Sequence, residues 1–185
     1  MKIAVYGGSF DCPTLGHTMV VAHLLLNDPS IDQIYVVPCY QQKGKNLTDF
    51  NHRITMCEKA FSHFSRTKVL PIEKELGGES LTVRLLKALT EREPDSSFRF
   101  IMGSDLLETA PKWQGWDEIQ TLAPPLIIGR AGISPQNNTD PTPISPIVSS
   151  TIVRLALAQG DYKEAERYIP APVCDYIIEN NLYKS

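Results

Sequence analysis

KIAVYGGSFD, residues 2–11, joins a short apolar run to a pair of glycines and a polar loop, and Gly16 and His17 then open an apolar helical segment. This order is typical of a buried strand, a turn and a helix. Because glycine has no Cβ, Gly7 and Gly8 would let a ligand approach the main chain closely. The helix start would offer unpaired N–H groups and the positive end of the helix dipole, which favour phosphate. The segment therefore predicts a nucleotide site in which His17 contacts a phosphoryl group.

The composition of the chain is that of an ordinary globular protein, with 185 residues, 42% of them hydrophobic and 21% charged. This length predicts one domain, residues 1–185, with a substantial core. The net charge of −3 gives no reason to expect a nucleic-acid partner. No apolar run is long enough for a membrane span and no leader is evident, so we expect a cytoplasmic protein. The oligomeric state stays open, a homo-oligomer included.

The cysteines and histidines do not predict a metal site. Cys12, Cys39, Cys57 and Cys174 have no C-x-x-C spacing, and no two histidines have the spacing of metal ligands. We expect buried or half-buried thiols instead of a zinc site or a disulfide framework.

Segments of strand and helix character alternate along the chain, which predicts βαβ units and a doubly wound parallel sheet flanked by helices. Right-handed crossovers would place the loops after the strands along one edge, where ligands bind in open α/β sheets. A G-x-G-x-x-G fingerprint after a strand is absent, which argues against a dinucleotide-dependent oxidoreductase. We expect strands at 3–6, 34–37, 68–72, 98–102 and 126–128, and helices at 16–26, 51–64, 80–92, 105–110 and 116–122.

The chain changes character after Arg130. Residues 131–147 hold four of the prolines and many small polar residues, which indicates a loop that is mobile or ordered by a ligand. Helices are expected again at 152–159, 162–168 and 173–180, so that residues from about 149 to 185 form a small C-terminal helical part.

Ser149-Ser150-Thr151 stand at the start of the first of these helices, with Arg154 one turn further along. One hydroxyl would suffice as a helix cap, and capping alone would explain such residues. Three hydroxyls together with a guanidinium also suit a triphosphate. The glycine loop at the other end of the chain favours the phosphate interpretation.

Three further segments have side chains suited to a nucleotide. Gly103-Ser104-Asp105 follow a strand, where the acid would either cap a helix or accept from ribose hydroxyls. Trp113 and Trp116 lie in the segment 111–116, which also holds a proline and a glycine; they could pack against the core, or one of them could stack on a flat ring. Lys43 and Lys45 lie in a polar loop that is either simply solvated or holds an anionic substrate.

These motifs together resemble a known family. Gly8-Ser9-Phe10-Asp11 with Gly16-His17, and Ser149-Ser150-Thr151 with Arg154, look like the nucleotidyltransferases of the HxGH type. The intervening blocks are similar to bacterial nicotinate-nucleotide adenylyltransferases, in the same order along the whole chain. Those blocks are FNHRITM (50–56), SLTV (80–83), FIMGSD (100–105), PKWQGW (111–116) and NLY (181–183).

The resemblance implies a reaction and a set of site residues. ATP and nicotinate mononucleotide would give the dinucleotide and pyrophosphate, with Mg2+ accompanying ATP and no covalent enzyme intermediate. The chain itself would supply no metal ligands. By this resemblance the catalytic residues are His17, Thr14 and Arg154; ATP would be bound by Gly7, Gly8, Ser9, Phe10, Gly16, Gly103, Asp105, Ser149, Ser150 and Thr151; and the acceptor would be bound by Lys43, Lys45, Thr82, Trp113 and Arg130.

The sequence departs from the family pattern at several positions. Thr14 stands in place of the first histidine, a residue that pantetheine-phosphate adenylyltransferases also use there. The 42–45 loop lacks the family's Pro-Pro-His-Lys, and Leu81 and Arg84 replace an aromatic and a small or acidic residue. Two alternatives therefore remain beside the nicotinate acceptor: adenylyl or cytidylyl transfer to another phosphate-bearing acceptor, and a nucleotide-binding paralogue without turnover.

Overall fold

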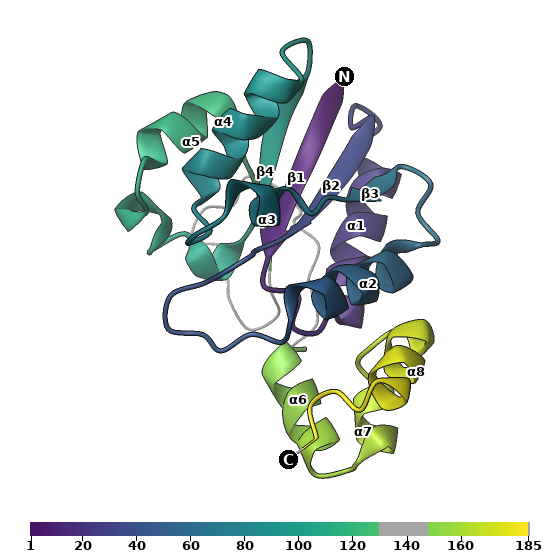
Figure 1. Ribbon diagram of the computed structural model, residues 1–185. Coiled ribbons are helices and arrows are strands. Elements are labelled where there is room, and N and C mark those ends of the chain that lie inside the picture. Colours follow the sequence, from purple (N-terminus) through teal and green to yellow (C-terminus); the bar gives the residue numbers. More distant parts are fainter. Residues whose placement is uncertain (130–147, 185) are drawn as a thin grey trace.

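The computed structural model describes residues 1–129 and 148–184, and its centre is a sheet of five parallel strands in the order β3-β2-β1-β4-β5 (Figure 1). After β1, the chain forms β2 and β3 on one side of this strand and then crosses over to form β4 and β5 on its other side. Strand order thus reverses between β1 and β4, whose carboxyl ends mark the usual ligand position in such sheets. The strands are β1 (Lys2–Gly8), β2 (Gln33–Pro38), β3 (Thr67–Val69), β4 (Ser97–Gly103) and β5 (Pro125–Ile128).

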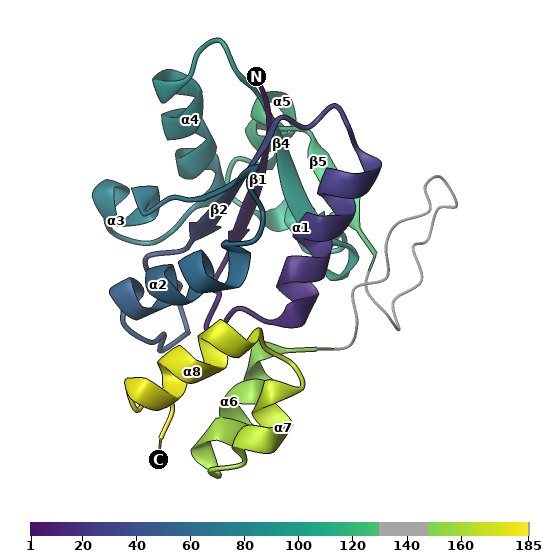
Figure 2. The same ribbon diagram turned by 90° about the vertical axis from the view of Figure 1, so that its right-hand side faces the viewer.

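Helices cover both faces of the sheet, because side chains of the buried strands alternate between two apolar layers. Ala4 of β1 belongs to a core shared with α1 (Leu15–Asn27) and α2 (Phe50–Phe61). Ile3 and Val5 belong to a second core on the opposite face, shared with α3 (Ile72–Leu76), α4 (Thr82–Arg92) and α5 (Trp116–Leu122). Figure 2 shows α1 and α4 on opposite sides of the strands.

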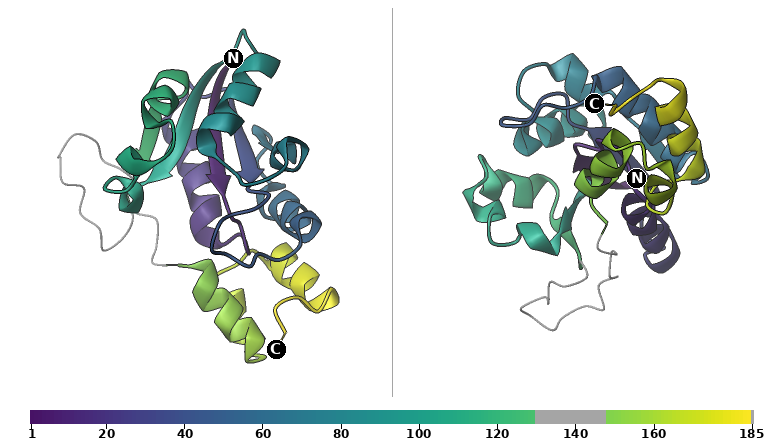
Figure 3. Two further views of the ribbon diagram at one scale, coloured as in Figure 1. Left: turned by 60° about the vertical axis from the view of Figure 1, so that its left-hand side comes forward. Right: turned by 90° about the horizontal axis from the view of Figure 1, so that it is seen from below.

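Three helices lie beyond the carboxyl ends of the strands: α6 (Ser150–Ala158), α7 (Tyr162–Glu166) and α8 (Ala171–Glu179) (Figures 1 and 3). Their buried side chains, among them Val153 and Val173, continue the core that contains α1 and α2. His52 of α2 also shares a hydrogen bond of 2.8 Å with the Tyr176 hydroxyl of α8. The C-terminal helices therefore lie at the carboxyl ends of the strands, where a ligand would bind in such a sheet.

The expected doubly wound parallel fold is confirmed, but the predictions for two of its elements are wrong. The strand expected at 68–72 ends at Val69, because Pro71 has no N–H for the strand ladder, and Ile72 instead begins α3. The helix expected at 105–110 is replaced by two 3-10 turns, Ser104–Leu106 and Ala110–Lys112. The other expected helices are present, with ends shifted by a few residues.

Within residues 1–129 and 148–184, no helix combines the length and the apolar character that crossing a bilayer requires.

Candidate active site

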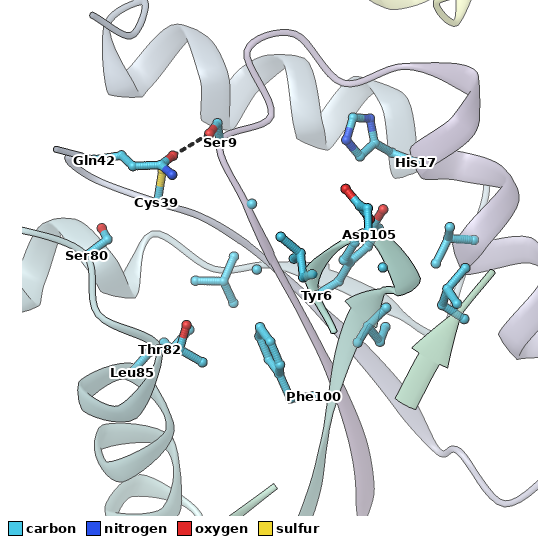
Figure 4. Close-up of a pocket in the computed structure, with 18 of the residues that line it drawn as sticks. Tyr6, Ser9, His17, Cys39, Gln42, Ser80, Thr82, Leu85, Phe100 and Asp105 are labelled. Carbon is cyan, nitrogen blue, oxygen red and sulfur yellow. Dashed lines mark hydrogen bonds between the residues drawn. The ribbon is translucent and has the colours of Figure 1, made fainter. Parts of the chain in front are cut away.

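A cavity of about 550 Å3 opens at the carboxyl ends of β1 and β4, the position at which strand order reverses. The end of β1 contributes residues 6–9 and the end of β4 contributes Phe100, Ile101 and Gly103. The starts of α1 and α4 face this cavity from two sides. In Figure 4, His17 and Asp105 lie on one side of the cavity and Ser80 and Thr82 on the other. Some of the predicted nucleotide residues, among them His17 and Asp105, thus share one cavity with the predicted acceptor residue Thr82.

The imidazole of His17 is held by Thr14, the residue before α1. The main-chain N–H of Thr14 donates to Nδ1 of His17 at 2.9 Å, and the Thr14 hydroxyl lies 2.8 Å from the same nitrogen. Because a main-chain N–H can only donate, Nδ1 is the acceptor and the neutral ring carries its proton on Nε2. His17 thereby presents an N–H donor, the group that a phosphate oxygen needs.

The start of α1 differs from the expectation in one respect. The main-chain N–H of His17 donates to the Thr14 carbonyl at 3.0 Å, and that of Leu15 donates to the Tyr168 carbonyl at 2.8 Å. The expected unpaired N–H of His17 is therefore absent, because the first turn of the helix is closed by Thr14. The side chain of His17, which lines the cavity, is its route to a ligand.

Phe10 is buried beneath the site and does not line the cavity. Its side chain is 2% exposed, and its ring centroid lies 5.1 Å from that of His17. The rings of Tyr6 and Phe61 meet it edge-on, at 5.3 and 6.2 Å. Phe10 therefore forms the floor against which the His17 ring packs.

Gly103 and Asp105 lie in the cavity wall after β4. A Cβ on Gly103 would collide with Oδ1 of Asp105, so glycine is needed for the carboxylate to fold back over the end of the strand. Asp105 itself is exposed. Its carboxylate therefore lies in the wall of the cavity.

Thr82 and Trp113, the two residues expected to hold the acceptor ring, also line the cavity. Trp113 packs edge-on against Phe100 at 6.2 Å and against Trp116 at 6.1 Å. The two tryptophans therefore form one aromatic wall, of which Trp113 is the member that reaches the cavity.

Glu73 is a cavity-lining carboxyl that sequence reasoning missed. It is 3% exposed, and its Oε2 has no hydrogen-bond partner among the described residues. Burial raises the pKa of the Glu73 carboxyl, while the Ser80 hydroxyl and the Arg84 guanidinium oppose this rise. Its place in the charged run of residues 73–75 gave no sequence signal for burial.

Replacing Glu73 by glutamine is expected to stabilise the fold at neutral pH by on the order of 1 kcal/mol. The pKa of this acid is higher in the folded state, so the wild type loses stability as the pH rises from the ordinary carboxyl value through the raised one. Thermal unfolding of both proteins from about pH 4 to about pH 8 should show the gap widening with pH. Glu79→Gln, at an exposed position, is the control. A gap that is constant across this range would contradict the prediction.

The loop after β2 contributes Lys45 to the cavity wall, whereas Lys43 is not among the residues that line the cavity. Lys45 Nζ donates to the Ser9 hydroxyl at 3.3 Å, and this hydroxyl donates to Gln42 Oε1 at 2.7 Å (Figure 4). Of the two lysines, Lys45 is thus the one that the fold brings to the glycine loop.

The hydroxyls at the start of α6 are engaged with the chain itself. Ser149 caps the helix by accepting from the Ile152 N–H, and Ser150 donates to the Cys12 carbonyl at 2.7 Å. Arg154 donates to the Asp11 carbonyl and to the Thr151 hydroxyl. None of these four predicted phosphate ligands is among the residues that line the cavity, although the neighbouring Val148 is. Arg130 and the loop 131–147 lie outside the described residues.

Asp11 ties the glycine loop to the C-terminal part, a role with no local sequence signal. Its carboxylate accepts from the Tyr183 hydroxyl at 2.5 Å and from the Thr48 N–H at 3.2 Å. Burial, followed by the neighbouring Cys12 and Asp11, raises the pKa of Tyr183, so the hydroxyl stays a donor. Residues 172 positions apart are thereby joined beside the start of α1.

The cysteines are free thiols, as expected. Cys12 is fully buried, and burial raises its pKa to about 12. Cys57 and Cys174 are buried too, so these thiols are packing residues. Among the described residues, no three His, Cys, Asp or Glu side chains gather as a metal cluster.

The comparisons with known proteins agree with this fold and site, which define a nucleotidyltransferase. The model of the cytidylyltransferase-like family matches residues 5–156. An Anaeromyxobacter sp. (strain K) protein named a probable nicotinate-nucleotide adenylyltransferase is 33% identical, over 99% of this chain and 97% of its own. The Bacillus subtilis (strain 168) nicotinate-nucleotide adenylyltransferase is 31% identical, over 100% of this chain and 99% of its own. The chain belongs to the nicotinate-nucleotide adenylyltransferase family.

Solved structures lead to the same family. A Plasmodium falciparum nicotinic acid mononucleotide adenylyltransferase complexed with NaAD is 30% identical, with a TM-score of 0.77 over 98% of this chain and 97% of that one. The same protein complexed with APC gives 28% identity and a TM-score of 0.78, over 98% and 96%.

Proposed function

We propose that this chain transfers the adenylyl group of ATP to nicotinate mononucleotide, which gives nicotinate adenine dinucleotide and pyrophosphate in NAD biosynthesis. One observation carries the proposal: a single cavity of about 550 Å3 is lined both by residues 6–9, Thr14 and His17 and by Thr82 and Trp113. Two nucleotides that react must share one space, and this cavity offers polar groups at both ends. The Plasmodium relative complexed with NaAD supports this choice of product.

The reaction consists of one bond exchanged for another at the α-phosphorus of ATP. A phosphate oxygen of the acceptor forms a bond to this phosphorus, and the bond from phosphorus to the bridging oxygen of pyrophosphate breaks. No covalent intermediate with the protein is needed, so the protein contributes positioning and charge stabilisation. The Nε2–H of His17 would donate to the α-phosphate oxygen on which charge develops.

The two substrates would occupy opposite ends of the cavity. The main chain of Gly8 and Ser9 would lie along the phosphates of ATP, and the Asp105 carboxylate would accept from the ribose. At the other end, Thr82 would hydrogen-bond the nicotinate group and Trp113 would stack on its ring. This placement is supported by Trp113 and by Thr82 at the start of α4, because both side chains line the cavity.

Mg2+ would enter with ATP as part of the substrate. No cluster of metal-ligating side chains is present among residues 1–129 and 148–184, and Mg2+ commonly binds through substrate phosphates with few protein carboxylates. Ser149, Ser150, Thr151 and Arg154 remain the proposed partners of the β- and γ-phosphates. Ser150 and Arg154 would first have to exchange their present contacts with the carbonyls of Cys12 and Asp11 for the nucleotide.

We also propose that residues 1–185 form one domain that works in the cytoplasm. The apolar core that joins α1 and α2 to α6, α7 and α8 supports the single domain.

The test is pyrophosphate release from Mg–ATP with nicotinate mononucleotide, nicotinamide mononucleotide and phosphopantetheine offered separately. We expect release with nicotinate mononucleotide, and formation of the dinucleotide in equal amount. Release with another acceptor alone would replace the proposed acceptor, for which Arg84 and the 42–45 loop are the first residues to examine. Binding of ATP without release for any acceptor would indicate a paralogue that does not turn over.

A further inference from the structure

Arg53 is a buried cation in α2, with a side chain that is 1% exposed. Among residues 1–129 and 148–184, its guanidinium donates only to main-chain carbonyls. Nε donates to Thr48 at 2.8 Å, Nη1 donates to Ser9 at 3.0 Å and to Cys39 at 2.7 Å, and Nη2 donates to Tyr40 at 3.1 Å. One side chain thereby joins the turn after β1 to the loop after β2.

In the described part of the chain, the charge of Arg53 is stabilised by main-chain carbonyl dipoles and by one aromatic ring. No carboxylate of the described residues forms an ion pair with it, and its guanidinium carbon lies over the ring of Phe50, 5.3 Å from the centroid. Burying an ion in this way is costly, and a similarly sized apolar side chain would fill the space with less penalty. The planar fork of an arginine, however, fixes several carbonyls in one geometry, which a lysine or an apolar residue does not.

Two of the four residues whose carbonyls Arg53 binds, Ser9 and Cys39, line the cavity, although Arg53 itself does not. The Ser9 hydroxyl accepts a hydrogen bond from Lys45 Nζ at 3.3 Å, and the Cys39 N–H donates to the Gly8 carbonyl at 2.9 Å. Ser9, Cys39 and Lys45 all line the cavity. Lys45 therefore belongs to a loop whose first residues, Cys39 and Tyr40, are held by hydrogen bonds from Arg53.

We propose that Arg53 is a positioning residue, which holds the 39–45 loop against Ser9 so that the ammonium of Lys45 meets the phosphate of the acceptor. The inference rests on the proposed function and names the residue behind one of its substrate contacts. A lysine side chain has several rotatable bonds, so a fixed loop lowers the entropy that is lost when its ammonium binds a phosphate.

The test is a double-mutant cycle with Arg53→Lys and Lys45→Met, read as kcat and KM for nicotinate mononucleotide at saturating Mg–ATP. Lysine at 53 keeps the charge but loses most of the four carbonyl contacts. Each single variant is expected to raise the KM of the acceptor by about tenfold, with a smaller change in kcat. The double variant should be no worse than the poorer single variant, because Arg53 acts through Lys45.

The opposite result would overturn the proposal. If the effects of Arg53→Lys and Lys45→Met on KM multiply, or if Arg53→Lys changes only stability, Arg53 is merely structural. Lys163→Met, on the exposed surface of α7, is the control for loss of a positive charge and should combine multiplicatively with Arg53→Lys. Inactivity of the wild type would refute the proposed function separately. In that case, the Kd of nicotinate mononucleotide is measured by calorimetry for the wild type and for the variants of the cycle, in place of kcat and KM.

A second variant keeps the proposal testable if Arg53→Lys loses its cooperative unfolding transition. Gln42→Ala removes the hydrogen bond that the Ser9 hydroxyl donates to the same loop, at an exposed position. We expect a higher KM for the acceptor at an unchanged Tm, and no further rise when Lys45→Met is added. An unchanged KM in Gln42→Ala would show that fastening of this loop to Ser9 does not set the Lys45 contact.

Discussion

Replacing His17 by alanine is expected to lower kcat by about 10²–10³-fold, the effect of removing one donor that stabilises charge in a transition state. The Kd of ATP should change little, because Nε2–H is proposed to meet the oxygen on which charge develops during the reaction. Thr14 orients the ring through Nδ1, so the donor is already directed before substrate arrives. The measurement is kcat from pyrophosphate release together with the Kd of ATP from calorimetry.

His63→Ala is the matched control, because His63 is an exposed histidine outside the cavity. Its kcat and its Kd for ATP should equal those of the wild type. Equal losses in kcat and ATP affinity in His17→Ala would show that His17 binds the ground state, which would contradict a role confined to the transition state.

Replacing Phe10 by alanine is expected to lower the free energy of unfolding by about 3–5 kcal/mol, the range for a buried phenylalanine. The ring is almost fully buried and fills the space between Tyr6, His17 and Phe61. The main chain at this residue has a φ of 45°, a strained value that alanine would keep, so removal of the ring brings no compensating relief. Urea titrations of the two proteins give the difference directly.

Leu26→Ala measures the background, since this side chain is 82% exposed and its loss should change stability by less than about 0.5 kcal/mol. A loss below about 1 kcal/mol in Phe10→Ala would mean that the aromatic cluster collapses around the gap. The Phe10→Ala variant also separates two roles of Phe10. If the ring supports His17, its removal lowers the free energy of unfolding and kcat together. If the ring only contacted the nucleotide, its removal would change the KM of ATP alone.

Most of the fold follows from local pattern. Buried parallel strands are apolar along their whole length, and four of the five expected strands are confirmed at nearly the expected residues. The failures have local causes: Pro71 stops β3, and Pro111 lies in a segment that closes as 3-10 turns. A pattern of apolar residues does not distinguish these cases, because it records side-chain spacing and not main-chain hydrogen bonding.

The residues of the candidate site also fall into two groups, those that local sequence features predict and those that they do not. Glycines at strand ends and a histidine at a helix start are local features, so the amino-acid sequence alone predicts Gly8, His17 and Gly103 as site residues. It does not predict Glu73, Arg53 and Asp11, because their partners lie on other segments. Tyr183 reaches Asp11 across 172 positions, and no local pattern encodes such a contact.

The sequence by itself thus determined the class of fold, the glycine-rich turn and the histidine that follows it, because each depends on residues close together in the chain. Only the tertiary structure decided which of the predicted residues share the cavity. It placed Lys45 on the cavity wall and Lys43 outside it, and it buried Phe10 under His17, where the ring does not line the cavity. The physical reason is that burial and hydrogen-bond partners are set by the crossing of strands and helices, which bring distant segments together in three dimensions.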